Sequence, residues 1–276
     1  MKSRAMHWIL QNNIFNEDAY NVLEETLQRF NIPYSVHKVV PFVGDLLPEP
    51  ELTTNNAICM GSYSMRHWAK KAGVYPGVFD LEPFHFDVQL EHWGDHMLNA
   101  DAVVTRYEDA HFPEEKMFIR PIEDSKVFAG KVMDREDFRG WQKQVCVLKL
   151  DFGGSLNNDT MVQVCPIKKI YSEHRFWIVN GKIATASTYK QGHRVVYIPN
   201  PDEVYHEYVR ERIAEWQPHV AFVIDVADTD TGLKIVEINT LNSCGFYACD
   251  MQKLVMALED GFDENGKEES STSTNN

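Results

Sequence analysis

The sequence predicts a mixed α/β protein with two domains and an acidic tail. Strand and helix patterns alternate over the first hundred residues, whereas strand-like apolar runs dominate the next hundred and sixty. The chain beyond Glu259 is first acidic and then rich in Ser, Thr and Asn. We therefore expect an N-terminal α/β domain over residues 1–100, a domain with antiparallel sheets over 101–259 and a disordered tail over 260–276.

The N-terminal domain is expected to resemble half of a doubly wound, Rossmann-like sheet. Apolar residues recur at helical spacing from Tyr20 to Phe30, and Gly73 is placed to end a short helix over 65–72. A further helix is expected over 88–98. The apolar runs that predict strands in this domain are 7–11, 33–41 and 57–61.

The second domain is expected to consist mainly of strands. Asn180-Gly181 lies between two of them and favours a tight hairpin, because both residues accept positive φ. Amphipathic spacing predicts a helix over 201–217, and another is expected over 250–258. The predicted strands are 117–122, 144–151, 161–167, 175–179, 183–189 and 194–198.

Composition excludes several classes of protein. A net charge of −14 opposes binding to nucleic acids or anionic membranes. No apolar run reaches the roughly 18 residues of a membrane span, and the run 6–10 is too short for a signal peptide. The five cysteines form no CxxC pair, which indicates a reducing environment. We expect a cytoplasmic protein that binds neither nucleic acid nor membrane.

The segment from Val220 to Asn239 carries the clearest chemical signal. Its Val- and Ile-rich flanks and its turn at 228–232 predict an antiparallel hairpin. Glu237 and Asn239 are two apart and share a face, and Asp225 falls on the same face if Ala227 pairs with Leu233. Buried carboxylates are costly without a partner, and oxygen ligands of this kind bind Mg²⁺. The segment therefore predicts a metal site.

Together with upstream motifs, this hairpin resembles the ATP-grasp superfamily, and most of all its R2K clade of small proteins that are frequent in bacteriophages. The resemblance covers roughly 118–258 and rests on the order and spacing of several segments. These are Phe118-Ile119-Arg120-Pro121, Asp124-Ser125-Lys126, Gly130-Lys131-Val132, Gln163-Val164-Cys165-Pro166, Glu173-His174-Arg175-Phe176, Glu237-Ile238-Asn239 and Thr240 to Gly245.

The resemblance implies an ATP-dependent, Mg²⁺-requiring ligase that joins a carboxylate to an amine through an acyl phosphate. The N-terminal α/β domain would then be the preceding domain that helps to hold the acceptor substrate. The partner would be a small molecule or peptide that carries a carboxylate, and an amine acceptor. Amino acids and peptide termini are the substrates that the resemblance suggests.

The resemblance also implies roles for individual residues. Asp225, Glu237 and Asn239 would hold Mg²⁺. Arg120 stands where many ATP-grasp ligases have Lys, which leaves open whether Lys126 or Lys131 reaches the nucleotide. The other implied ligands are Arg175 or Arg194 for phosphate, Lys190 as a phosphate-facing cation, the backbone near Val164 and Cys165 for adenine, Glu173 for a ribose hydroxyl, and Asn242, Ser243 and Gly245 for the acceptor.

Two other functions fit the same residues. A phosphotransferase could use the same nucleotide geometry to phosphorylate an alcohol, and a non-catalytic nucleotide-binding protein could retain the fold. Cys244 follows the metal strand, but no residue near it in sequence would activate a thiol, so we expect a structural role for it.

Overall fold

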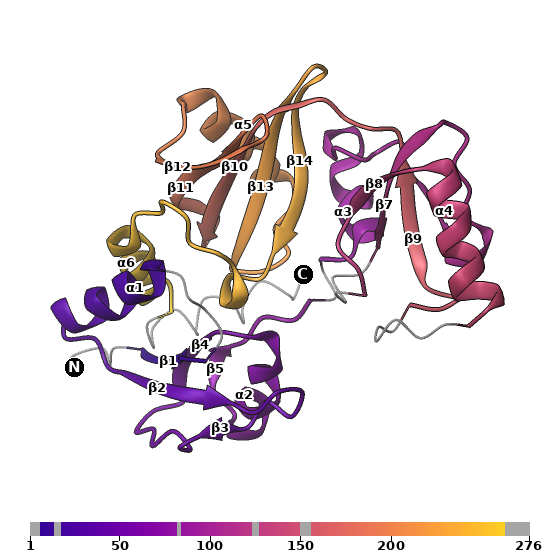
Figure 1. Ribbon diagram of the computed structural model, residues 1–276. Helices are drawn as coiled ribbons and strands as arrows, with labels where there is room; N and C mark the ends of the chain where they lie inside the picture. The colour runs from indigo at the N-terminus through magenta and orange to yellow at the C-terminus, as the bar shows by residue number, and fades with distance from the viewer. Residues whose placement is uncertain (1–5, 14–17, 82–83, 123–126, 150–155, 263–276) are drawn as a thin grey trace, which may run out of the picture. The chain divides into compact units, whose positions relative to one another are not determined.

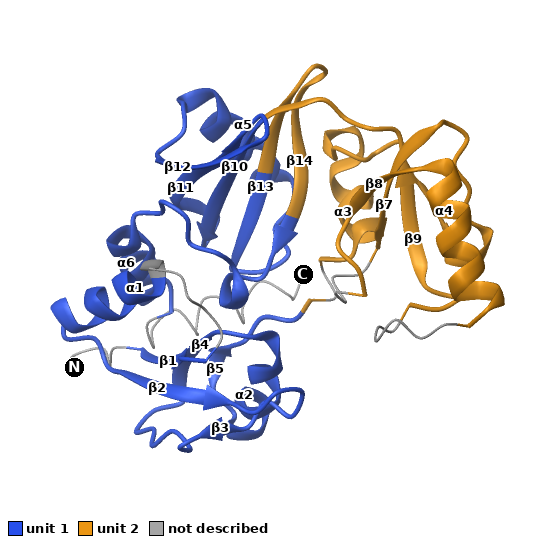
Figure 2. Cartoon of the chain, viewed as in Figure 1, with its two compact units in different colours: residues 1–80, 172–225, 238–276 blue, residues 81–171, 226–237 orange. Residues whose placement is uncertain are grey.

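The computed structural model describes residues 6–13, 18–81, 84–122, 127–149 and 156–262. In these ranges the chain forms three sheets with helices between and beside their strands (Figure 1). Contacts divide it into two compact units (Figure 2). Unit 1 contains residues 1–80, 172–225 and 238–276, and unit 2 contains residues 81–171 and 226–237. The predicted combination of an N-terminal parallel sheet and later antiparallel sheets is confirmed.

The first sheet lies in unit 1 and has the strand order β3-β2-β1-β4-β5. Its central strand β1 pairs in parallel with β2 and β4, as expected for a doubly wound arrangement. The two outer strands, β3 and β5, were not predicted because each is only two or three residues long. The elements are β1 (His7–Gln11), α1 (Asp18–Arg29), β2 (Tyr34–Val39), β3 (Leu46–Leu47), β4 (Asn56–Met60), α2 (Arg66–Ala72) and β5 (Tyr75–Gly77).

The second sheet lies in unit 2 and is antiparallel, with the order β6-β9-β7-β8. The predicted helix over 88–98 begins earlier and ends at Trp93, followed by a 3₁₀ turn over 94–96. The elements of this unit are α3 (Phe86–Trp93), β6 (Val103–Arg106), β7 (Lys116–Pro121), β8 (Lys131–Asp134), α4 (Arg135–Gln142) and β9 (Met161–Cys165).

The strand predicted over 144–151 is wrong. Helix α4 instead continues into a π-helical turn over Lys143–Val147. Phe138 and Val145 are both buried in the core of unit 2, so the apolar residues face inward at helical spacing. Packing has overridden the preference of the β-branched run for a strand.

The third sheet has the order β12-β11-β10-β13-β14. The hairpins predicted at Asn180-Gly181 and within 220–239 are both present: Asn180 and Gly181 have φ of 47° and 67°, and Asp230 and Thr231 form the second turn. The elements are β10 (Ile170–Val179), β11 (Lys182–Gln191), β12 (Arg194–Pro199), α5 (Glu203–Glu215), β13 (Ala221–Thr229), β14 (Gly232–Asn239) and α6 (Met251–Gly261).

One hydrophobic core joins both ends of the described chain within unit 1. It contains Trp8 from β1 and Leu258 from α6, and α1 and α6 lie side by side (Figure 1). Glu259 accepts hydrogen bonds from the Trp8 indole (2.6 Å) and the Met6 backbone (3.1 Å). Ordered chain therefore continues past the predicted start of the tail at residue 260, because Phe262 is also buried. Residues 263–276 lie outside the described ranges.

None of the described helices is both long enough and apolar enough to cross a membrane.

Candidate functional site

Asp225 on β13 lies in a buried ion pair with Arg175 on β10. The guanidinium donates from Nε (2.8 Å) and Nη2 (2.7 Å) to the two carboxylate oxygens. The side chains are only 8% and 1% exposed. Burial lowers the pKa of Arg175, but the charge of Asp225 and the hydrogen bonds to it outweigh burial and raise that pKa well above its ordinary value. Arg175 therefore stays positively charged.

Aromatic rings and a carbonyl oxygen enclose Arg175. Its Nη1 donates to the Gly245 carbonyl at 3.2 Å, and its Cζ lies 4.8 Å from the ring centre of Tyr247. Tyr247 stacks on Tyr189 and Tyr197, with centroid distances of 4.9 and 5.8 Å. Tyr247 adopts φ of 47°, which is unusual for a bulky side chain and is typical of strained functional loops.

Asn239 lies beside Asp225. Its Nδ2 donates to Oδ2 of Asp225 at 3.4 Å, so these two side chains, from the neighbouring strands β13 and β14, share a face as the hairpin predicts. Glu237 lies two residues earlier on β14. In unit 2, Arg120 Nη1 donates to Glu237 Oε2 at 2.8 Å, and these side chains are 26% and 30% exposed.

The donor set formed by Asp225, Glu237 and Asn239 fits Mg²⁺ chemically, because each side chain offers a carboxylate or amide oxygen. A carboxylate can accept about four hydrogen bonds or metal contacts, so a bidentate arginine does not exhaust Asp225. Among the described residues, no group of three or more His, Cys, Asp or Glu side chains is arranged to hold a metal. The donor set predicted from the sequence accordingly combines two carboxylates, Asp225 and Glu237, with the amide oxygen of Asn239.

Glu173 on β10 is engaged by neighbours on β11. The Tyr189 hydroxyl donates to it at 2.7 Å, and Lys190 forms an ion pair with its other oxygen. Burial, with the charges of Asp225 and Glu173, raises the pKa of Tyr189, which keeps the phenol protonated as a donor. Glu173, predicted to bind the ribose, and Lys190, predicted to face a phosphate, therefore form an ion pair with each other.

The remaining predicted cations have different surroundings. Lys131 lies over the Trp141 ring, with Nζ 3.6 Å from the centroid, and burial lowers its pKa. Arg194 on β12 is exposed and has no ion-pair partner within the described ranges. Lys126 lies outside them.

Val164 and Cys165 lie at the end of β9. Val164 pairs with Val103 on one side and Ile119 on the other, so the sheet flanks it on both sides. Burial raises the pKa of the Cys165 thiol to about 12. The residues that follow, 166–169, belong to no helix or strand. Backbone available to a ligand is therefore expected just after Cys165.

Asn242 has a structural role that the sequence did not predict. Its Oδ1 accepts from the Phe79 backbone and from Thr240 Oγ1, and its Nδ2 donates to the carbonyls of Cys59 and Gly77. These four bonds use the capacity of a side-chain amide. Asn242 is therefore not available to contact an acceptor, and Ser243 and Gly245 are the remaining candidates for that role.

Cys244 has the structural role expected of it. It is 3% exposed, it accepts a hydrogen bond from the Trp177 indole at 3.3 Å, and burial raises its pKa to about 11. A protonated, enclosed thiol is a poor nucleophile.

Sequence reasoning missed the tyrosines beside Arg175 and the buried His174. His174 bonds to Ser172 Oγ and Thr188 Oγ1, both at 2.8 Å, and stacks on Tyr205 at 3.9 Å. Burial lowers its pKa to about 4. The polar run from Ser187 to Gln191 in β11 is a signal in the sequence that could have indicated partners for the polar residues of β10.

Comparison with known proteins gives two results on sequence. The family model described as "ATP-grasp domain, R2K clade family 3" matches residues 72–258. No curated protein matches the chain.

Three solved structures illustrate the likeness in fold. A D-alanine–D-alanine ligase from Bacillus anthracis, also solved with ATP, is 15% identical with a TM-score of 0.60, over 96% of this chain and 100% of its own. A RimK domain protein ATP-grasp from Sphaerobacter thermophilus is 12% identical with a TM-score of 0.60, over 93% and 99%. The ATP-grasp ligase PsnB with minimal precursor, Mg and ADP is 11% identical with a TM-score of 0.54, over 93% and 97%.

Proposed function

Because the chain belongs to family 3 of the R2K clade of ATP-grasp domains, we propose that it is an ATP-dependent ligase that joins a carboxylate to an amine. The observation that carries the proposal is the contact between Asn239 and Asp225 on neighbouring strands, which brings these two side chains together on one face of the hairpin. The structures solved with ATP and with Mg and ADP support the choice of nucleotide and metal.

Asp225, Glu237 and Asn239 are the residues proposed to hold Mg²⁺, which would neutralise the β- and γ-phosphates when bound. Arg175 uses two donors on Asp225 and one on Gly245, so we assign it to positioning the carboxylate rather than to phosphate contact. Arg120, which donates to Glu237, is proposed to add a phosphate contact beside that residue.

The other contacts follow the resemblance. The backbone at and just after Val164 and Cys165 would face adenine, and Glu173 would accept a ribose hydroxyl with Lys190 beside it. Lys126, Lys131 and Arg194 are proposed as further cations for the phosphates. Ser243 and Gly245, next to Tyr247, would contact the acceptor.

The proposed reaction needs no nucleophile from the enzyme, because substrate groups make both attacks. A carboxylate oxygen of the substrate attacks the γ-phosphorus, the bond from that phosphorus to the β–γ bridging oxygen breaks, and ADP leaves. The amine then attacks the acyl carbon, the carbon–oxygen bond to phosphate breaks, phosphate leaves, and the nitrogen loses a proton to solvent. The protein's contribution would be positioning and electrostatic stabilisation.

The test measures ADP release with mixtures of amino acids and peptides in the presence of Mg²⁺, with and without hydroxylamine. A ligase forms a hydroxamate when hydroxylamine intercepts the acyl phosphate. ADP formation with a stable phosphorylated product and no hydroxamate would indicate a phosphotransferase instead. Tight ATP binding without ADP formation in any mixture would overturn the ligase proposal.

A further inference from the structure

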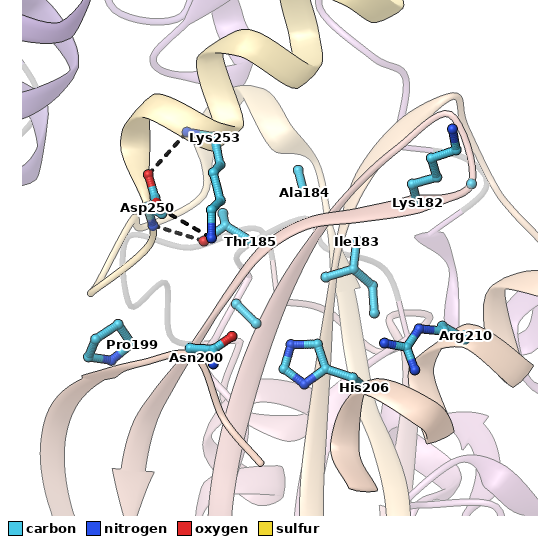
Figure 3. Close-up of a pocket in the computed structure, with 12 residues that line it drawn as sticks. Lys182, Ile183, Ala184, Thr185, Pro199, Asn200, His206, Arg210, Asp250 and Lys253 are labelled. Carbon is cyan, nitrogen blue, oxygen red and sulfur yellow. Dashed lines mark hydrogen bonds and ion pairs between the residues drawn. The ribbon is translucent and has the colours of Figure 1, made fainter. Parts of the chain in front are cut away.

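Unit 1 contains a cavity that none of the proposed ATP contacts lines. Its volume is 440 Å³, which lies within the range of roughly 300–1,000 Å³ that is usual for small-ligand pockets. The first half of β11, the end of β12, α5 and the start of α6 enclose it (Figure 3). The charged and polar side chains that line it are Lys182, Thr185, Asn200, His206, Arg210, Asp250 and Lys253.

The floor of the cavity is a strand edge that no described strand covers. β12 pairs with β11 only from Ser187 to Gln191, and the Asn200 N–H then donates to the Ala186 carbonyl at 3.1 Å. Residues 182–185 come before the first β12 pair, so no described strand pairs with their outer edge. Uncovered edges present backbone groups that can bind a ligand.

A β-bulge lies in the same part of β11, in its pairing with β10. On β10, Trp177 pairs with Thr185 and Ile178 pairs with Ile183, which leaves Ala184 without a partner in the ladder. Bulges are frequent beside functional sites, because they leave one residue unpaired in the ladder and bend the strand. Here the bulge also stops a further strand from pairing regularly along the edge, so a compact ligand fits better than an extended one.

The charge of the lining is opposite to that of the protein. Lys182, Arg210 and Lys253 face a single carboxylate, Asp250, in a chain whose net charge is −14. Asp250 also caps α6 by accepting from the Lys253 N–H at 3.1 Å. Such a local concentration of cations attracts anions in spite of the global charge.

The cations can be recruited at small cost. Arg210 pairs with Glu203 at 2.7 Å, but these side chains are 53% and 64% exposed, and such pairs contribute at most about 1 kcal/mol. Lys253 is 3.6 Å from Asp250. Lys182 has no ion-pair partner within the described ranges.

The cations also stand apart from one another. Figure 3 shows Lys253 on the α6 side and His206 and Arg210 on the α5 side, with β11 between them and Lys182 toward one end. A ligand with one negative group could pair with the cations on only one side of the cavity, either the α5 side or the α6 side. We propose that the cavity binds a small polyanion that carries two or more phosphate or carboxylate groups, independently of the ATP site.

The experiment uses the full chain without Mg²⁺ and two probes, inorganic pyrophosphate and citrate, in calorimetric titrations and in NMR titrations of backbone amides. We expect saturable binding of at least one probe, with amide shifts at Ala184, Thr185 and Lys253. Binding of pyrophosphate alone supports a phosphate-bearing ligand, and binding of citrate alone supports a polycarboxylate.

Charge reversal provides the control. The double variant Lys182→Glu, Lys253→Glu is expected to weaken binding at least about tenfold. Lys71→Glu, an exposed lysine on α2, is expected to leave it unchanged, as is Glu237→Gln in the proposed ATP site. Arg210→Gln serves as a milder variant if the double variant unfolds. Absence of binding by both probes, or equal binding by the charge-reversed protein, would overturn the proposal.

Discussion

The two arginine–carboxylate pairs at the proposed ATP site differ in burial and geometry. Arg175 and Asp225 form a bidentate pair that is almost fully buried, whereas Arg120 and Glu237 share a single hydrogen bond and are each about a quarter to a third exposed. Breaking a buried pair strands a charge, while an exposed pair contributes little to stability. We therefore expect the buried pair to support the fold and propose that the exposed pair takes part in nucleotide binding.

The largest expected effect comes from breaking the buried pair. Asp225→Ala leaves the Arg175 guanidinium without its partner and should lower the free energy of unfolding by about 3–5 kcal/mol. Denaturant titration with circular dichroism measures this change. If instead the variant is as stable as the parent protein, Arg175 cannot be buried as the structure shows.

A pH titration tests the burial of β10 independently of that pair. His174 has a folded pKa of about 4 against an ordinary value of 6.5, because burial disfavours its protonation. Its contribution is fully present above pH 6.5 and is lost as the pH falls toward 4, because only the unfolded state binds the proton in that window.

The loss over this window is expected to reach about 3 kcal/mol. Unfolding free energies of the parent protein and of His174→Gln, measured between pH 7 and pH 4, give the difference. The parent should lose more stability on acidification than the variant, and parallel curves would place His174 in contact with solvent.

The exposed pair should show the opposite balance of effects. Glu237→Gln is expected to change the free energy of unfolding by less than about 1 kcal/mol but to reduce Mg²⁺-dependent ADP formation about 100-fold, which corresponds to about 2.7 kcal/mol. Both quantities are measured on the same preparation. An active variant would remove Glu237 from the metal site.

The smallest effect is expected for Arg120→Lys. Lysine retains the charge that many ATP-grasp ligases have at this position but loses the planar fork of the guanidinium. We expect a stability change within about 0.5 kcal/mol and a KM for ATP that rises more than kcat falls. A large loss of stability would show that this pair, too, supports the fold.

The comparison also shows what the sequence could and could not predict. The hairpin of β13 and β14 follows from local alternation and turn residues, so its existence and the shared face of Asp225 and Asn239 were predictable. The partner of Asp225 was not, because Arg175 lies 50 residues earlier and only the order of the strands in the sheet brings it near.

Other errors have similar physical causes. The run at 144–151 is short, apolar and β-branched, a pattern that fits a strand or a buried helical turn equally well until Phe138 and Val145 are seen to pack together. Asn242 follows a motif that suggests a ligand, yet it bonds to backbone groups near residues 59, 77 and 79. Packing in the core of unit 2 decided the first case, and contacts with segments far away in the sequence decided the second.

The shared core of β1 and α6 has a consequence for synthesis on the ribosome. Trp8 and its neighbours on the first sheet are covered by residues from the last described helix, including Leu254 and Leu258. During translation, that apolar face stays uncovered until α6 has left the ribosome. We therefore expect the first sheet to complete its folding only after α6 has been synthesised, with its apolar face exposed to solvent until then.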